Sequence, residues 1–393
     1  MESAPKSFYH FTIIGAGASG LFLAQALLHY GLLKEQTLCI VESDTTKHND
    51  RTWCYWNKGP LTADPFVSKV WSEARPLYST NSSLHPYQYH HIHSADFYQH
   101  MKSELLKCNN IHWVFDTVIQ TEQLNDQVSV LGLKHHWTTL KLFTSAAIDK
   151  TLINPANPKR FSKKEIHIKQ SFVGWRVHTQ EPVFDSERMT LMDFNVPQHN
   201  HTQFLYVLPF TKTDALLELT RFGEAAITRE EAELELKRQL KELNCSYKII
   251  EEEVGCIPMT NAFDLKNPHY PAATKIIPIG TLAGAIKPTT GYGFKRMHAH
   301  AQAIAQALSN NLPIPTTKRK PRFQFYDVLL LTILKKYPSK GKSIFERLFK
   351  SQPLPLILKF LDEETTIKEE IIIFSKLPIL LFVRTLLNHM LRL

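Results

Sequence analysis

Hydrophobic and polar positions follow two different periods along the chain of 393 residues. A β-branched run ending at Ile14, a glycine turn, an apolar helical stretch and a buried run ending at Glu42 predict strand, turn, helix and strand over 8–44. A second helix is expected to begin near Ser94, where serine and aspartate side chains can cap its first turn. Further buried strands are expected at 111–119, 140–149 and 274–280.

The middle of the chain, about 165–265, alternates apolar and polar residues with period two, for example in TQFLYVLPF and DALLELTRF. This alternation predicts a mostly antiparallel sheet with one covered surface. A charged helix is expected over 229–243 and another helix over 293–308. The remaining C-terminal residues are also helix-forming.

The predicted elements define an α/β fold with a Rossmann-like FAD/NAD(P)-binding domain, an inserted, mostly antiparallel β-sheet domain for the substrate, and a helical C-terminal tail. The sheet domain separates the first strands of the nucleotide-binding unit from its last strand near residue 276. The expected boundaries are 7–75, 104–152 and 268–310 for the discontinuous FAD-binding domain, 76–103 and 153–267 for the substrate-binding sheet, and 311–393 for the basic helical region.

The segment IIGAGASG carries three glycines at the spacing G-x-G-x-x-G. Gly15 permits a tight turn, Gly17 lets the backbone approach a pyrophosphate, and Gly20 lets helix and strand pack closely. Glu42 follows Gly20 by 22 residues, at the position where an acid accepts ribose hydroxyls and disfavours a 2′-phosphate. These residues predict a dinucleotide site, but they do not choose between NAD and FAD.

A second glycine-rich loop, IGTLAGAIKPTTGYGF, precedes the helix that begins near Gly293. Gly280, Gly284 and Gly291 allow close backbone approach, and the helix start offers N–H groups to negative charge. In FAD enzymes of this general plan a loop of this kind meets the isoalloxazine ring, so it favours FAD, with Tyr292 among the predicted cofactor-binding residues. The alternative is that the loop is only a tight connection.

The net charge of +9 is concentrated in one segment. Between Lys318 and Lys350 there are ten lysines or arginines against two acids, Asp327 and Glu346. Such a stretch suits an anionic partner such as phospholipid head groups; the alternative is a solvated helical face. We expect a membrane surface and no nucleic acid.

The five cysteines include no C-x-x-C pair, which disfavours a disulfide framework or a zinc cluster and fits a reducing cytosol. The nineteen histidines show no metal-ligand spacing, so no metal site is expected. The polar N-terminus does not resemble a signal peptide, and no apolar stretch is long enough to span a membrane. These features predict a cytoplasmic protein.

Several segments together resemble the lycopene cyclase family, the flavoproteins that close the ionone rings of carotenoids. The resemblance covers nearly the whole chain, and its more specific pieces are RTW and PTTGY. The segments that carry it are GAGASG with Glu42, NDRTWCYW (49–56), FVGW (172–175), MDF (192–194), LYVLPFTKTDALLELT (205–220) and KPTTGYGF (287–294).

The resemblance implies an isomerase that uses FAD in its reduced form, with NAD(P)H or another donor needed only to reduce it. The substrate would be a linear carotenoid, whose terminal double bond is protonated, cyclises as a carbocation and then loses a proton. Reduced flavin would stabilise the cation electrostatically. Because a hydrocarbon substrate dissolves in the bilayer, we expect the protein to be peripheral on the membrane, attached through the basic stretch and the apolar C-terminus.

The resemblance also indicates the acid. The family signature is shaped like F-L-E-E-T, with a glutamate proposed as acid–base; here LLELT retains Glu218 but has Leu219 in place of the second acid. A carboxyl at Glu218 that faces a hydrocarbon pocket would have a raised pKa, which suits a general acid. The look-alike string FLDEET (360–365) is interpreted as a capping and surface feature of the tail.

Four further residues are candidates by position. Arg51 and Trp53 follow the second strand and could contact the flavin phosphate and enclose the site. Trp175 and Asp193 are candidates for lining the polyene channel. The sequence gives no oligomeric state and no ring type.

Two other functions remain open from the sequence. One is a flavin-dependent oxidoreductase, either a reductase of isoprenoid double bonds or a hydroxylase. Hydroxylases of this plan usually carry Gly-Asp in the late loop, whereas Thr281 follows Gly280 here. The other is a membrane-surface flavoprotein without catalysis, for which the missing acid at Leu219 would be the clue.

Overall fold

The fold of the computed structural model is built around three sheets. It describes residues 6–47, 49, 51–61, 65–75, 77, 82–146, 165–265, 274–317 and 319–390. The first sheet has the order β7-β2-β1-β10-β9-β8, with β16 also paired to β10. Its strands are β1 (Phe8–Ile14), β2 (Leu38–Glu42), β7 (Ile111–Phe115), β8 (Val118–Gln123), β9 (Val128–Gly132), β10 (His136–Thr144) and β16 (Ile276–Pro278).

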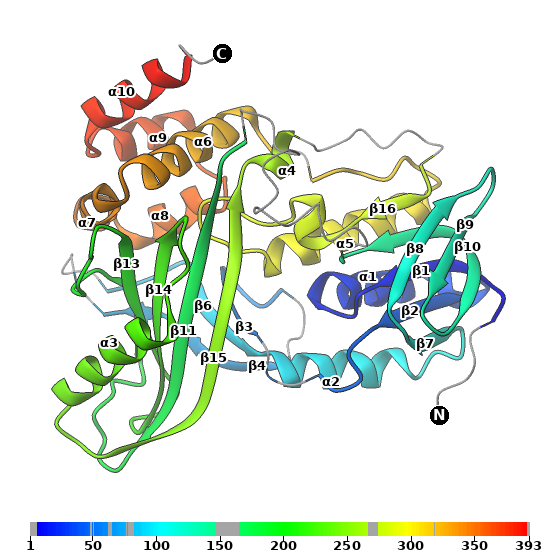
Figure 1. The fold of residues 1–393 in the computed structure, drawn as a ribbon, viewed down its shortest axis with the longest axis horizontal. Coiled ribbons are helices and arrows are strands. Elements are labelled where there is room, and N and C mark those ends of the chain that lie inside the picture. Colours follow the sequence, from blue (N-terminus) through cyan, green and yellow to red (C-terminus); the bar gives the residue numbers. More distant parts are fainter. Residues whose placement is uncertain are drawn as a thin grey trace.

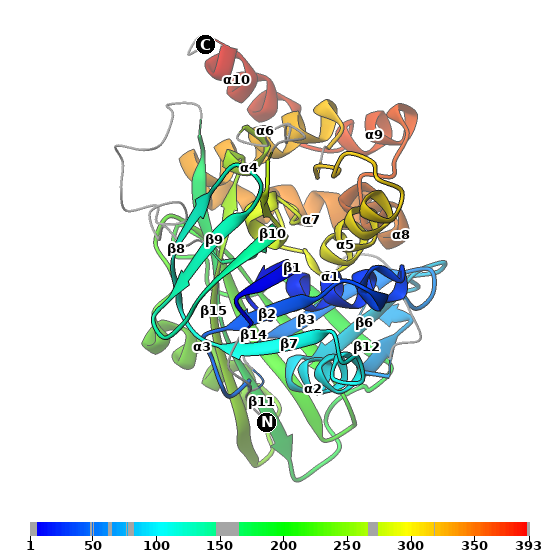
Figure 2. The same ribbon diagram turned by 90° about the vertical axis from the view of Figure 1, so that its right-hand side faces the viewer.

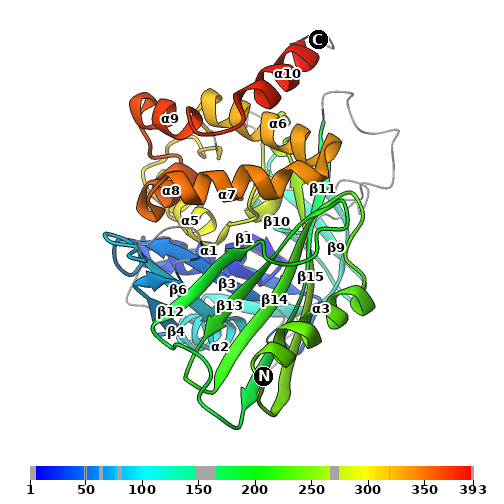
Figure 3. The same cartoon turned by 90° about the vertical axis from the view of Figure 1, so that its left-hand side faces the viewer.

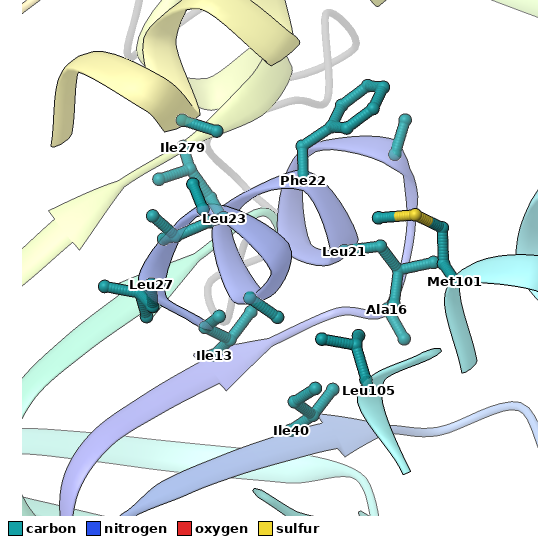
Figure 4. Packing of buried hydrophobic residues seen from close by; sticks show 14 of the residues in the cluster. Ile13, Ala16, Leu21, Phe22, Leu23, Leu27, Ile40, Met101, Leu105 and Ile279 are labelled. Carbon is teal, nitrogen blue, oxygen red and sulfur yellow. The ribbon is translucent and has the colours of Figure 1, made fainter. Parts of the chain in front are cut away.

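The pairs β7–β2, β2–β1, β1–β10 and β10–β16 are parallel, as expected for a Rossmann-like unit. Helices α1 (Ala18–His29), α2 (Ser94–Leu105) and α5 (Phe294–Ser309) share one apolar core with this sheet. Figure 4 shows this core, in which Leu23 and Leu27 of α1 lie near Ile13, and Leu105 of α2 lies near Ile40. A second core on the other face of the sheet includes Trp137 of β10.

The second sheet has the order β15-β11-β14-β13-β12-β5. Its long strands are antiparallel, and helix α3 (Arg229–Glu242) covers its outer face (Figure 3). Its strands are β5 (Glu73–Ala74), β11 (His167–Thr179), β12 (Arg188–Asp193), β13 (Thr202–Pro209), β14 (Asp214–Gly223) and β15 (Tyr247–Thr260). The predicted antiparallel sheet is therefore confirmed.

A small third sheet joins the other two, with the order β3-β6-β4. It is formed by β3 (Thr52–Asn57), β4 (Val67–Trp71) and β6 (Gln88–His93), and it lies between the nucleotide-binding unit and the large sheet (Figure 1). The boundary expected between residues 75 and 76 divides this sheet. Helix α2, expected within the substrate domain, packs with α1 and β2 instead.

The tail is helical, as predicted, and consists of α6 (Pro321–Lys336), α7 (Gly341–Ser351), α8 (Leu354–Leu361), α9 (Ile367–Phe374) and α10 (Ile379–Met390). The short α4 (Ala262–Leu265) lies earlier in the chain, directly after β15. Helices α6 to α9 share a core with the inner face of the large sheet and with β3 and β6. Figure 2 shows the tail helices gathered at one end of the molecule. Within the described ranges, no helix combines the length and apolar character needed to cross a bilayer.

Two local predictions are corrected by the structure, and part of a third falls outside the described residues. The segment 111–119 forms two strands, β7 and the start of β8. Ser94 does not cap α2, because its backbone N–H and hydroxyl donate to Asn49 Oδ1. The last three residues of the strand expected at 140–149 lie outside the described residues.

The interpretation of FLDEET as a surface feature is wrong. Glu363 is 9% exposed. Its Oε1 accepts hydrogen bonds from Lys287 Nζ at 3.1 Å and from Arg319 Nε at 2.9 Å. Arg319 also pairs with Asp264 and Asp327. Burial alone would raise the pKa of Glu363, but the neighbouring cations lower it to about 2. The string therefore belongs to a buried ionic cluster.

Several cations of the basic stretch between Lys318 and Lys350 form ion pairs within the protein. Arg319 is buried, and Arg322 pairs with the buried Glu370 at 3.0 Å, whereas Lys335 pairs with Glu224 at 3.1 Å on the surface. Lys318 lies outside the described residues. Part of the predicted cationic surface is thus an internal framework.

Candidate active site

A cavity of about 640 Å³ lies between the nucleotide-binding unit and the inner face of the large sheet. One part is lined by Gly17 and the first turn of α1. Another part is lined by Tyr206, Leu216 and Glu218 of the large sheet. One space therefore joins the glycine loop to the candidate acid.

The three glycines of the first loop meet different surroundings. Gly15 has φ +95°, and a Cβ there would overlap Ser145 Oγ; a Cβ on Gly20 would overlap the Gly15 carbonyl oxygen. A Cβ on Gly17 would meet no atom of the described residues within 4 Å, although Gly17 lines the cavity. Positions 15 and 20 therefore need glycine because a side chain would overlap other protein atoms. At position 17 the absence of a side chain instead leaves open space in the cavity.

Helix α1 begins after Gly17 without a side-chain cap and without an acid in its first turn. Helix α5 likewise begins after Gly293 without either. Residues of both first turns line the cavity. Uncapped N–H groups at a helix start attract anionic groups. Both helices therefore direct N-termini that can bind an anion toward the same cavity.

Glu42 is held at the end of β2 by several donors. Its Oε2 accepts from Ala16 N–H at 2.8 Å and its Oε1 from Asp44 N–H at 3.1 Å, while Lys47 Nζ lies 3.0 Å away. Burial would raise the pKa of Glu42, but these donors and the Lys47 charge lower it. Glu42 is not among the lining residues, whereas Lys47 is.

The late loop packs directly against the first. A Cβ on Gly280 would overlap Ser19 Oγ of α1, and Gly291, Tyr292 and Gly293 line the cavity. Gly284, with φ +74°, instead lies against Phe263 and Thr317. The structure thus brings Gly291 and Tyr292 to the cavity and places Gly284 in a turn away from it.

Arg51 and Trp53 both line the cavity. The Trp53 ring lies 5.2 Å from that of Phe97 and 5.3 Å from that of Phe294, so it is fixed against α2 and α5. Gln170 of β11 also lines the cavity, and its amide oxygen is buried without a hydrogen-bond partner among the residues that the structure describes.

These features fit an FAD molecule. The open space over Gly17 and the two uncapped helix starts suit its phosphates. The unpartnered Gln170 Oε1, 3.0 Å from where a Gly291 Cβ would be, suits a donor on a polar ring edge. Gly17, Lys47, Arg51 and Gly291 are the residues that would contact the cofactor.

Glu218 lies on β14 with its carboxyl toward the cavity. Thr220 Oγ1 donates to Glu218 Oε1 at 2.6 Å. Protein surrounds the side chain, yet it stays partly exposed because it faces the cavity. Burial, and then the charge of Glu253 on β15, raise the pKa of Glu218 well above its ordinary value. Burial and the Glu253 charge therefore favour the protonated form of this carboxyl relative to an ordinary glutamate.

Three tyrosines surround the acid end of the cavity. Tyr206 is paired with Glu218 across β13 and β14, and the Tyr89 and Tyr292 hydroxyls lie 2.8 Å apart. Burial raises the pKa of all three. They remain neutral hydroxyls, and with Phe172, Leu208 and Leu216 they form a largely apolar and aromatic wall.

Two predicted channel residues lie elsewhere. Trp175 is buried on the outer face of the sheet, in the core beneath α3. Asp193 ends β12 and accepts from Asn195 N–H at 2.8 Å. Neither residue lines the cavity.

Sequence reasoning missed Glu253, Gly174, Gln170, Tyr89 and Tyr206. Period-two alternation places Gln170, Phe172 and Gly174 on the face opposite to Trp175, and this signal was present in the sequence. The proximity of Glu253 was not, because it depends on the register of β15 against β11.

Comparison with known proteins gives a consistent result. The family model described as lycopene cyclase protein matches residues 11–387. A lycopene beta-cyclase of Paracoccus sp. (strain N81106 / MBIC 01143) is 28% identical over 137 residues, which are 35% of this chain and 35% of that protein. The match therefore spans about a third of this curated relative.

Solved structures support the fold. A geranylgeranyl bacteriochlorophyll reductase-like protein of Thermoplasma acidophilum has a TM-score of 0.57 at 13% identity, covering 98% of this chain and 99% of that one. A variant of HpxO from Klebsiella pneumoniae, complexed with FAD, has a TM-score of 0.61 at 12% identity, covering 91% and 98%. The α/β fold, with its FAD-binding plan, inserted antiparallel sheet and helical tail, is thus confirmed.

Proposed function

This chain belongs to the lycopene cyclase family, and from that premise we propose that it is an FAD-dependent carotenoid cyclase. It would convert linear, lycopene-like ends into ionone rings without net oxidation or reduction. The observation that carries the proposal is Glu218, whose carboxyl of raised pKa faces the same cavity as the glycine loop.

The proposed reaction uses this carboxyl as the acid. The O–H bond of Glu218 breaks as a C–H bond forms at the terminal double bond of the polyene. The resulting carbocation closes the ring, and loss of a proton restores a double bond. A general acid of this kind typically contributes about 100- to 10,000-fold in rate.

The walls of the cavity suit a cation. Phe172, Leu208 and Leu216 exclude water that would add to it, and the faces of Tyr206 and Tyr292 favour positive charge. FAD in its reduced form, supplied with electrons by NAD(P)H, would add negative charge close to the forming ring.

The tail suits attachment to a membrane surface, where a carotenoid resides. Helices α9 and α10 lie at one end of the molecule (Figures 1 and 3) and expose large apolar side chains. We call these side chains the tail apolar set: Ile367, Ile371, Ile372, Ile379, Leu380, Val383 and Leu387. Exposed cations at Lys368, Lys376 and Arg384 are interspersed with them.

The direct test is incubation of the protein, with its FAD reduced, with lycopene. We expect cyclic products of the same mass as the substrate. A linear product heavier by two hydrogens would instead support the alternative, a flavin-dependent reductase of isoprenoid double bonds. Bound FAD with no conversion of lycopene would point to a flavoprotein without this activity.

A further inference from the structure

Glu253 stands beside Glu218 although their strands are not neighbours. Strands β14 and β15 flank β11, and Gly174 of β11 pairs with Glu218 on one side and with Glu253 on the other. Adjacent strands lie about 4.8 Å apart, so β14 and β15 are separated by roughly 9.6 Å. Two glutamates can meet across that gap only if both lie on the same face and no side chain stands between them.

Gly174 provides that gap. A Cβ on Gly174 would lie 3.0 Å from Glu253 Cγ, 3.1 Å from Glu253 Oε1 and 3.1 Å from a methyl carbon of Leu216. Glu253 therefore extends over Gly174 toward Glu218, through space that any other residue would occupy. A glycine inside a strand commonly marks such a close approach.

The hydrogen bonds leave one oxygen of Glu253 for Glu218. Thr220 donates to Glu218 Oε1 at 2.6 Å, and Thr52 donates to Glu253 Oε2. Glu253 Oε1 is buried, and no protein N–H or hydroxyl group in the described ranges donates to it. Two adjacent carboxylates repel each other, whereas a carboxyl and a carboxylate that share one proton form a strong hydrogen bond.

The surroundings contribute little other charge. Burial raises the pKa of the Cys54 thiol and of the three tyrosines, and lowers that of His91 to about 3, so these groups are neutral near pH 7. Arg176 and Glu251 lie 3.9 Å apart and offset each other. The titratable groups around the pair are Cys54, Tyr89, His91, His93, Arg176, Tyr206, Glu251 and Tyr292.

We propose that Glu253 shares one proton with Glu218 across Gly174 and thereby keeps Glu218 in its proton-donating form at neutral pH, an inference that rests on the proposed cyclase activity. Glu253 does not line the main cavity; it acts through Glu218 and is a positioning residue. Glu253 thus places a second carboxyl on the same face of the sheet as Glu218, whereas Leu219 lies on the opposite face.

The pair also closes the proton cycle. When Glu218 gives its proton to the polyene, two adjacent carboxylates remain, and their repulsion makes them a stronger base than a single glutamate. A C–H bond of the ring cation then breaks, and its proton returns to the pair as the double bond forms. The pair again holds one proton, which now comes from the ring and exchanges with solvent before the next turnover, and no oxidant or reductant is consumed.

Infrared spectroscopy of the protein without substrate tests the pair. The carboxyl C=O stretching band is followed against pH in the full-length protein, and the band of Glu218 is identified by its loss in Glu218→Gln. In Glu253→Gln the like charge is gone, so the Glu218 carboxyl is expected to ionise at a pH at least one unit lower. The alkaline limb of the pH profile of cyclisation should move to lower pH by the same amount. At a pH above this limb, a shift of one unit lowers the rate by about tenfold.

Two further variants sharpen the result. Glu252→Gln is the matched control, because Glu252 lies next in β15 but accepts from Trp175 Nε1 on the opposite face; it should leave the titration unchanged. Gly174→Ala should displace Glu253 and shift the titration in the same direction as Glu253→Gln. An unchanged titration in Glu253→Gln overturns the shared proton. A shifted titration in a protein that does not cyclise lycopene supports the pair and overturns the proposed function.

Discussion

At the scale of single residues, Glu218 and Leu219 show how a strand divides adjacent positions. Consecutive side chains point to opposite faces: Glu218 faces the cavity, while Leu219 is 1% exposed in the core beneath α3. An acid at position 219 would be buried among Leu236 and Leu240 rather than beside the substrate. The departure from the family signature therefore leaves the cavity unchanged.

Glu218→Gln is the residue-scale prediction. Glutamine keeps the size and the bond from Thr220 but has no acidic proton, so we expect cyclisation to fall by about 100- to 10,000-fold while FAD remains bound. The matched control is Glu364→Gln, at an exposed position of the tail, which should leave turnover intact. Near wild-type turnover by Glu218→Gln would remove Glu218 from the role of donor.

At the scale of elements, sequence patterns were sufficient to predict features that depend only on residues close together in the chain. The spacing of Gly15, Gly17 and Gly20 predicted the first strand, turn and helix, and period two predicted the faces of β14. The sequence could not give the contact of Glu253 with Glu218, because it depends on which strands are neighbours. For the same reason Glu363 was misjudged, since its cationic partners come from segments at least 44 residues away.

The glycine loop allows a prediction that separates binding from folding. In Gly17→Val the side chain enters open cavity space, so the protein should fold and lose its FAD. In Gly20→Val the side chain would collide with the Gly15 carbonyl, so folding itself should suffer. Flavin absorbance and thermal unfolding of both variants check this, and a yellow, FAD-saturated Gly17→Val would contradict the placement of the pyrophosphate.

At the scale of the whole molecule, the helical tail holds a loop of the cavity in place and also exposes an apolar surface. Lys287, in the late glycine-rich loop, reaches Asp327 of α6 at 3.0 Å and Glu363 at 3.1 Å. The tail thus holds the loop that carries Gly291 and Tyr292. The tail apolar set is exposed, and the helices that carry it, α9 and α10, lie at one end of the molecule (Figure 2).

The prediction at this scale concerns vesicle binding. Leu380 is 86% exposed, and burying a leucine side chain in a bilayer interface is worth about 1.5–3 kcal/mol. Leu380→Glu should therefore weaken co-sedimentation with anionic vesicles by at least about tenfold. Leu234→Glu, on the exposed side of α3, is the control and should bind as wild type. Equal binding by both variants would exclude α10 as the attachment site.

The most direct test of the central claim is lycopene cyclisation in D₂O with FAD reduced. The exchangeable proton of Glu218 is then a deuteron, and it should appear in the product once per ring, at the carbon that was protonated. The product should otherwise be isomeric with lycopene. A cyclic product without deuterium, or a linear product that has gained two hydrogens, would contradict acid-initiated cyclisation by this protein.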